Sequence, residues 1–474
     1  MTDERLLENF LVSPIDYRYG RSEVKAIFSR KERLRKMLLV EYAAARAESE
    51  FGLVPPSVPK DLKNVIDKNL VRMDEVNAVE HEINHDVMAM VKVLSDKAGK
   101  AGAYVHYGLT SNDVNDTATA LQLKDFFPYF YESLISLQGT LSIIIREHSN
   151  TVIIGRTHGQ HASPLTFGMK MSVFLTEISR HLTRLMETQP RILVGKLMGP
   201  VGTGAFLGKD APAIQKRCME MLGLGYDYVS TQIVGRDRYI EYLSVMNNIS
   251  TTIERLATEV RNLQRPEISE VAEHFRAQSQ VGSSSMPSKQ NPIDSESVCS
   301  LARYLRSLII PEYEAGVYWH ERDLTNSALE RFVIPYSSIL TDFIVSRMDN
   351  IMSNLEIRKE QMVKNLLADR YYMSESLVKL LVSKGMARQD AHELVRICSI
   401  EAKNTGKNVS DVLMGRAVDL HLNSEEISTA LDPKSFTGSS AYLCNVAVEE
   451  AERMRTKVQE RIGELKRNQA PGKI

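Results

Sequence analysis

Apolar residues recur along this chain at intervals of three and four residues, the spacing of one face of an α-helix. The clearest run has seven apolar positions, which are Tyr242, Met246, Ile249, Ile253, Leu256, Val260 and Leu263. A strict alternation of four and three residues forms one seam along a helix, as in bundles and coiled coils. Pro266 disfavours helical geometry in the residue before it and so ends this helix. At ~1.5 Å per residue, the helix would be about 35–40 Å long and would suit a bundle core or a subunit interface.

Similar periodicity predicts further long helices. They cover Ser22–Glu50, Met73–Lys97, Asn112–Glu147, Leu165–Glu187, Ser295–Tyr313, Ala328–Asn354 and Ser440–Lys466. Pro335 lies inside the sixth, where we expect a kink or a later helix start. Alternation with a period of two is scarce, and Thr151–Ile154 and Arg191–Met198 are the best candidates for strands. The chain is therefore predicted to be all-α, with a central bundle of long helices and smaller helical N- and C-terminal domains.

Glycine and proline concentrate between the predicted helices, in the junctions Gly99–Gly108, Gly155–Pro164, Gly195–Gly208 and Gly282–Pro292. Such helix ends are places where side chains and unpaired N–H groups converge on a ligand. The helices predicted in the last quarter of the chain are shorter, and a chain of 474 residues is too long for one compact core. We expect an N-terminal domain of residues 1–111, a central bundle of residues 112–358 that carries the loop 277–292, and a C-terminal domain of residues 359–474.

Composition narrows the classes of function. The chain has 59 basic and 60 acidic residues, which argues against a nucleic-acid binder or a binder of anionic membranes. The four cysteines form no CxxC pair, so they indicate neither a disulfide framework nor a thiolate zinc site and fit a reducing cytosol. No stretch approaches the ~18 uninterrupted apolar residues of a membrane helix. We expect a soluble, cytoplasmic protein with no nucleic-acid or membrane partner.

The segment from His81 to His85 reads HEINH and matches the HExxH pattern of zinc peptidases. On a continuous helix, both imidazoles would share one face, next to the carboxylate of Glu82. A glutamate ligand is missing downstream, because none occurs between Glu82 and Glu132. His106 or an aspartate could take its place, so a zinc hydrolase stays open as the less favoured alternative to a protein without a metal.

The loop AQSQVGSSSMPSKQNP (residues 277–292) holds the most informative polar cluster. Three serines follow Gly282, and Lys289 and Asn291 add a cation and an amide close to their hydroxyls. Serine and glycine are also typical of a solvated linker, and composition alone does not decide between a linker and a functional loop. Two prolines argue against a flexible spacer, and the loop leads into a helix near Ile293 whose positive dipole end favours an anion.

The part GSSSMPSKQNP resembles the signature loop of the fumarase/aspartase superfamily, GSSxMPxKxNP, at every fixed position. Two more segments, GRTHGQHASPLTFG (Gly155–Gly168) and HYGLTSNDVNDTA (His106–Ala118), resemble segments of the adenylosuccinate lyases within that superfamily. Shorter similarities follow in the family's order, in SPIDYRYG, HDVMAM, STQIVGRDR and WHERDLTNSALER. The C-terminal quarter contributes no motif.

This resemblance implies a β-elimination that releases fumarate from adenylosuccinate to give AMP, and from the succinyl-aminoimidazole-carboxamide ribotide of purine biosynthesis. It implies no cofactor, and a homotetramer whose active sites combine loops from different subunits. The reaction requires a base for the Cβ proton, a group that stabilises the extra negative charge, and an acid for the departing nitrogen. Another superfamily member, such as an argininosuccinate lyase, is the alternative.

The resemblance also assigns residues. Four are expected to be catalytic, with Ser283 as the base, His158 as the acid, Lys289 on a substrate carboxylate and Glu296 orienting a histidine. His161 lies in the same loop as His158, and spacing alone does not separate the two. The expected substrate contacts are Arg18, Tyr19, His85, Asp86, His106, Thr110, Ser111, Thr157, Gln232, Asn291, Arg322, Ser327 and Arg331. Three positions, Ser288, Gln290 and Asn326, depart from the family pattern, and the missing arginine at 290 removes one positive charge from the loop.

Overall fold

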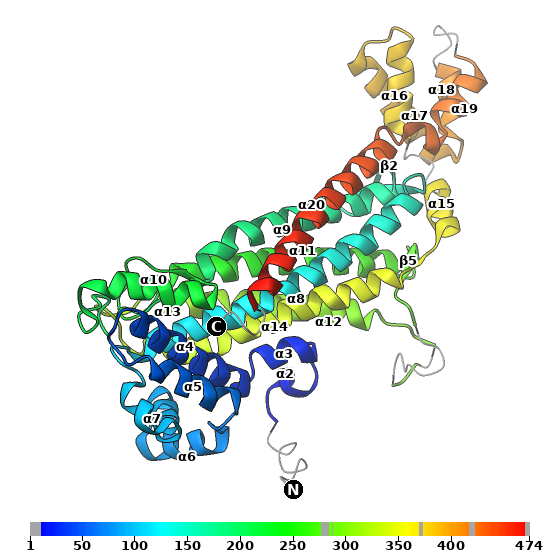
Figure 1. Cartoon of the computed structure of the whole chain (residues 1–474). Coiled ribbons are helices and arrows are strands. Elements are labelled where there is room, and N and C mark those ends of the chain that lie inside the picture. Colours follow the sequence, from blue (N-terminus) through cyan, green and yellow to red (C-terminus); the bar gives the residue numbers. More distant parts are fainter. Residues whose placement is uncertain (1–10, 276–283, 287, 369–372, 417–421, 470–474) are drawn as a thin grey trace.

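The computed structural model describes residues 11–275, 284–286, 288–368, 373–416 and 422–469. Long helices run side by side and form an elongated bundle (Figure 1). They are α8 (Ser111–Glu147), α9 (Phe167–Ile192), α11 (Asp237–Gln264), α12 (Ile293–Ser307), α14 (Thr325–Ser353) and α20 (Ser440–Gln469). α8 packs against α9, α14 and α20, and α11 packs against α9, α12 and α14. The prediction of an all-α bundle is confirmed.

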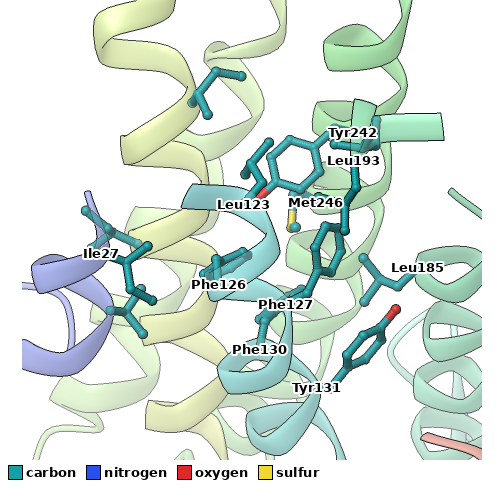
Figure 2. Packing of buried hydrophobic residues seen from close by; sticks show 14 of the residues in the cluster. Ile27, Leu123, Phe126, Phe127, Phe130, Tyr131, Leu185, Leu193, Tyr242 and Met246 are labelled. Carbon is teal, nitrogen blue, oxygen red and sulfur yellow. The ribbon is translucent and has the colours of Figure 1, made fainter. Parts of the chain in front are cut away.

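The apolar seam of α11 forms part of the bundle core. All seven predicted positions, from Tyr242 to Leu263, are at most 3% exposed. Aromatic side chains of α8 face this seam (Figure 2), and the rings of Phe127 and Tyr242 lie 6.3 Å apart between centroids. Burial of one apolar face along the whole helix explains why its period is so clear in the sequence.

Shorter helices gather at one end of the bundle, which we name the proximal end (Figure 1). It is the end where α8, α11 and α14 begin. The helices there are α4 (Arg30–Glu50), α5 (Ser57–Asp67), α6 (Met73–Ile83), α7 (Asp86–Ala98), the 3-10 turn η1 (Gly99–Tyr104), η2 (Gly208–Asp210), α10 (Ala211–Leu222) and α13 (Ile309–Ala315). The short helices α2 (Pro14–Tyr17) and α3 (Ser22–Ile27) lie along the bundle, where Arg21 donates to Asp342 of α14 at 2.7 Å.

The opposite end of the bundle, the distal end, carries a β-hairpin. Strands β1 (Val152–Thr157) and β2 (Gln160–Thr166) pair antiparallel between α8 and α9. Nearby, β5 (Val271–Ala272) pairs antiparallel with β6 (Glu356–Ile357), while β3 (Val194–Gly195) and β4 (Gly225–Tyr226) form a short parallel pair at the proximal end. β1 bears out the strand predicted at Thr151–Ile154.

Four small helices and a linking helix lie beyond the distal end. These are α15 (Lys359–Ala368), α16 (Ser374–Ser383), α17 (Arg388–Thr405), α18 (Val409–Arg416) and α19 (Ser424–Ala430), followed by the turn η4 (Pro433–Phe436). α16, α17 and α18 share a small apolar core that includes Leu381, Val395 and Leu413. α20 then returns and packs on α8 and α9, as part of the main core. The domain boundaries at residues 111 and 358 stay a prediction.

Several predicted helices are interrupted. Ser22–Glu50 divides at Ser29, whose hydroxyl accepts from the amide of Glu32 and so starts a new helix. Met73–Lys97 divides at Asn84, which has a left-handed backbone with φ 53°. Ser295–Tyr313 divides before Pro311, which has no N–H to continue the helical bonding.

Of the two outcomes expected at Pro335, a kink or a later helix start, the second is wrong, because α14 begins at Thr325 and runs through Pro335. Two further expectations were wrong. Most of the strand predicted at Arg191–Met198 is absent from the structure, because α9 continues to Ile192 and only two residues pair in β3. Much of the junction Gly155–Pro164 is strand, with a tight turn in place of a loop.

Candidate active site

The start of α8 gathers predicted substrate-binding residues. Thr110 caps the helix, and its amide donates to the carboxylate of Asp113 at 2.8 Å. The hydroxyl of Ser111 lies 3.4 Å from Nε2 of His85, which caps α7. Nδ1 of His85 accepts from the amide of Met88 at 3.3 Å, so Nε2 carries the proton that it donates to Ser111. These contacts bring together two of the segments that resemble the family, HDVMAM and HYGLTSNDVNDTA.

A buried ion pair holds the neighbouring glycine-rich junction in place. Asp113 and Lys196 form this pair, and both side chains are fully buried. The same carboxylate accepts from the amides of Met198 and Gly199, each at 3.1 Å. Because a buried charge needs a partner and hydrogen bonds, Asp113 fixes the junction against the first turn of α8.

Arg322 and Gln232 are also brought together. Nη1 of Arg322 donates to Oε1 of Gln232 at 3.0 Å, and its Nε donates to Oδ1 of Asn326 at 3.4 Å. Asn326 in turn donates to Glu330 at 2.9 Å. Burial lowers the pKa of Arg322, since its hydrogen-bond partners are neutral amides. Asn326, one of the departures from the family pattern, therefore supports a guanidinium that has no carboxylate of its own within the described ranges.

Three charged residues that were not among the predicted site residues form an ion-pair network next to Asn326. Arg236 donates to Asp116 at 2.8 Å and to Glu330 at 2.7 Å, and it is almost fully buried. The two carboxylates overcome the effect of burial, so the pKa of Arg236 is raised well above its usual value. All three residues lie in the resembling segments, and that position was the signal that could have identified them.

A cavity of about 340 Å³ opens beside this network, between the proximal helices and α8 and α14. Asp86, Arg322, Ser327 and Arg331 line it, and Arg331 donates to Asp86 at 2.6 Å. Arg33 of α4 also lines it and donates to Asn115 at 2.9 Å. Burial lowers the pKa of Arg33, and no described carboxylate lies within 4.0 Å of its guanidinium. Arg33 lies outside the short resembling segments, so no motif pointed to it.

Arg18 and Tyr19 lie farther along α14. The ring of Tyr19 packs edge-on against Phe343 with centroids 5.8 Å apart, and the guanidinium of Arg18 lies 5.7 Å from the centroid of the Tyr19 ring. Arg18 is exposed, and neither residue lines the cavity. Tyr19 is half-buried and packs against the main core of the bundle.

At the distal end, Thr157 and His158 lie at the tip of the β1–β2 hairpin. Thr157 pairs with Gln160, which leaves His158 and Gly159 as the two turn residues. Their φ angles of 54° and 74° are those of a type I′ turn, and His158 is exposed. The hairpin is anchored by Arg156, which donates through two nitrogens to the buried carboxylate of Glu270 at 2.8 and 2.9 Å.

The start of α12 lies at this same end. Ser283 lies outside the described residues, while Lys289 and Glu296 are exposed and Asn291 is half-buried. The amides of Asp294 and Ser295 donate to the carboxylate of Glu273, at 3.3 and 2.7 Å. Burial raises the pKa of Glu273. The helix end that was expected to attract an anion is thus already capped by a side chain of the protein.

The predicted site residues at the proximal end and those at the distal end are far apart within one chain. The 37 residues of α8 span about 55 Å at ~1.5 Å per residue, with Ser111 at one end and the hairpin beyond the other. Figure 1 shows the proximal helices and β2 at opposite ends of the bundle. A single chain therefore brings His85, Thr110, Ser111, Gln232, Arg322 and Arg331 into one region, and it does not bring His158 or Lys289 to them.

The HExxH interpretation is wrong. α6 ends at Ile83, Asn84 has a left-handed backbone, and His85 starts the next helix. His81 and His85 consequently do not share one helix face. Within the described part of the chain, no group of three or more His, Cys, Asp and Glu side chains is placed to hold a metal ion. The same residues contain no helix that is long and apolar enough to cross a membrane.

Two family models match the chain. One, described as a lyase family, matches residues 16–305, and the other, described as the adenylosuccinate lyase C-terminus, matches residues 371–446. An adenylosuccinate lyase of Pyrococcus horikoshii is 42% identical over 94% of this chain and 98% of its own length. That of Methanothermobacter thermautotrophicus is 39% identical over 93% and 99%.

Solved structures agree on the fold. A fumarate lyase of Mesorhizobium sp. BNC1 has a TM-score of 0.84 and 26% identity, covering 91% of this chain and 98% of its own. The 3-carboxy-cis,cis-muconate lactonizing enzyme of Pseudomonas putida has a TM-score of 0.84 and 28% identity, covering 93% and 99%. The near-complete match to the curated relatives decides between these branches. The chain belongs to the adenylosuccinate lyase family of carbon–nitrogen lyases.

Proposed function

We propose that this chain splits adenylosuccinate into AMP and fumarate, and the succinyl-aminoimidazole-carboxamide ribotide in the same way. The observation that carries the proposal is similarity to adenylosuccinate lyases over more than nine-tenths of both chains. The side chains present also meet the chemical demand, since the substrate carries a phosphate and two carboxylates and the proximal region offers guanidinium, hydroxyl and amide donors.

In the proposed reaction, the Ser283 alkoxide removes the Cβ proton of the succinyl group. The electron pair of that C–H bond becomes the new C=C bond, and the pair of the C–N bond stays on the departing nitrogen. His158 gives its proton to that nitrogen, and such a transfer typically contributes ~10²–10⁴-fold to the rate. Glu296 is proposed to orient the histidine of another subunit's hairpin.

In this scheme, Lys289 contributes most to stabilising the negative charge that develops on the substrate. The carboxylate of Glu273 already accepts from the first amides of α12, so those amides are not available to the substrate or to the Ser283 alkoxide. A cation next to the serines is then the main local source of positive potential. We propose that Lys289 neutralises the substrate carboxylate whose charge rises when the Cβ proton leaves.

We further propose that the chain works as a homotetramer in which the proximal region of one subunit meets the distal region of others. The length of α8 supports this arrangement, because one chain holds the two groups apart. Large apolar side chains are also exposed around the proximal end, including Tyr228 at 81%, Trp319 at 76% and Val317 at 75%. Exposed apolar patches are typical of subunit interfaces. Diluted protein that stays monomeric and fully active would contradict this part of the proposal.

The function is tested by incubating the purified protein with adenylosuccinate in the presence of EDTA and measuring fumarate. We expect fumarate and AMP in equal amounts. If adenylosuccinate stays intact while argininosuccinate or malate is converted, the protein belongs to another branch of the superfamily, and the substrate assignment is wrong.

A further inference from the structure

A buried carboxylate holds His106 by two bonds. Glu41 of α4 is 2% exposed, and its Oε1 lies 2.7 Å from Nδ1 of His106. Its Oε2 accepts from the backbone N–H of the same histidine at 2.9 Å. A carboxylate that receives both the ring N–H and the main-chain N–H fixes the ring's orientation as well as its tautomer.

The backbone of His106 is itself constrained. Its φ of 62° is left-handed, which is uncommon for a residue other than glycine and persists only where the surroundings enforce it. The bond from its amide to Glu41 is one such constraint. The other is the turn that follows, in which the amide of Leu109 donates to the carbonyl of His106 at 3.4 Å. His106 is therefore held in place by α4 and by the segment that leads into Thr110.

The second ring nitrogen of His106 is available. Nε2 has no hydrogen-bond partner among the residues that the structure describes, and 13% of the side chain is exposed. Thr110 and Ser111, expected to contact the succinyl group, follow four and five residues later. With Nδ1 occupied, the only polar atom that the ring offers to a ligand is Nε2.

The charges around His106 favour its protonated form. Burial alone would lower the pKa of His106, but the hydrogen bond to Glu41 and the charges of Glu41 and Asp113 outweigh it, so that the pKa is raised. Three further ionisable groups lie nearby: Lys196 pairs with Asp113, while Glu48 and Cys218 are buried close to Glu41. The Nε2–H of an imidazolium is a donor suited to an anionic oxygen.

We propose that Glu41 is a positioning residue, which holds His106 as a cation and leaves its Nε2–H to bind a carboxylate of the dicarboxylate substrate. This inference rests on the proposed function for the identity of the ligand. Glu41 lies 65 residues before His106 and outside the short motifs on which the predicted site residues rested. It acts through the imidazole and has no contact with substrate of its own.

The first test measures His106 directly and does not depend on activity. Diethyl pyrocarbonate reacts with neutral imidazole, so the pH at which His106 is half-modified, read by mass spectrometry of its peptide, reports its protonation. In Glu41→Gln the negative charge is lost, and we expect this pH to fall by about one unit or more. Glu41→Asp keeps the charge and should stay within about half a unit of wild type.

The second test is kinetic. Loss of a hydrogen bond to a charged group weakens binding by about 10–100-fold, so Glu41→Gln should raise KM for adenylosuccinate by that factor at pH 8, with a smaller change in kcat. Glu41→Asp should recover part of the loss. The matched control is Glu48→Gln, a buried glutamate on the same helix that does not contact His106, and it should change neither KM nor the modification pH.

The outcomes separate the two proposals. An active wild type combined with an unchanged modification pH and unchanged KM in Glu41→Gln overturns the role of Glu41. A wild type that releases no fumarate refutes the proposed function. Even then, a lowered modification pH in Glu41→Gln would support the proposal that Glu41 keeps His106 protonated. If Glu41→Gln does not fold, Glu41→Asp decides, because a shift of its modification pH as large as one unit would contradict the account.

Discussion

The two ends of the bundle offer very different surroundings to their polar residues. At the proximal end, Arg322, Gln232 and His106 are held by hydrogen bonds from several helices, next to buried charges. At the distal end, His158, Lys289 and Glu296 are exposed. Residues that recognise a charged substrate gain from being fixed in advance, whereas an exposed residue needs a second surface to exclude water from it. The difference supports a site in which another subunit covers the distal residues.

The largest expected effect concerns the distal end. His158→Gln should lower kcat by ~10²–10⁴-fold, because it removes the proposed proton donor. The melting temperature should stay close to that of wild type, since the side chain is exposed at the tip of a turn. Steady-state fumarate release and a thermal melt provide both values.

His161→Gln is the matched control, because His161 lies in the same hairpin opposite Arg156. It should keep most of the activity. A larger loss in His161→Gln than in His158→Gln would exchange the roles of the two histidines.

The next effect concerns the proximal end and stability. Asp113→Asn leaves the charge of Lys196 buried without its partner, which should lower the free energy of unfolding by ~3–5 kcal/mol. The matched change toward the distal end is Glu452→Gln, whose pair with Arg146 is about half exposed and should contribute at most ~1 kcal/mol. Urea denaturation of both variants makes the comparison. Equal losses of unfolding free energy in the two variants would mean that the buried pair of Asp113 and Lys196 contributes no more to stability than the exposed pair of Glu452 and Arg146.

A further effect on stability depends on pH. Burial raises the pKa of Glu48 to about 8, so the folded state holds a proton that the unfolded state releases at lower pH. The stability that protonated Glu48 contributes is fully present below the pKa that Glu48 has in the unfolded state. It is lost as pH rises from about 5 to 8. Glu48→Gln should remove this dependence, so its stability relative to wild type should grow by at most about 1.4 kcal/mol per pH unit over that window. A constant difference from pH 5 to pH 8 would contradict the assignment.

Periodicity in the sequence predicted the long helices well and their interruptions poorly. The seam of α11 is visible because one face is buried along its full length. The breaks at Ser29 and Asn84 depend on one capping hydroxyl and one left-handed residue, which barely disturb an apolar period. β2 was missed because its residues read as a Gly- and Pro-containing junction, while the turn at His158 and Gly159 folds it back on β1.

Site residues could be predicted from the sequence only where they lie in the short segments that resemble the family. These segments contain Thr110, Ser111, Gln232 and Arg322, which the structure brings together. Glu41 and Arg33 lie on α4, outside those segments, and reach their partners only through tertiary packing over 65 and 82 residues. Local sequence does not record such contacts. The capping of α12 by Glu273 was hidden for the same reason, since the carboxylate comes from about twenty residues earlier in the chain.

The most direct test of the shared site mixes two damaged proteins. His158→Gln impairs only the distal region and Arg322→Gln only the proximal region, so each variant alone should be nearly inactive. If proximal and distal residues come from different subunits, random mixing after reversible dissociation should restore about a quarter of wild-type fumarate release, because some sites then contain no altered residue. Activity of the mixture that stays equal to the mean of the two variants would contradict the account.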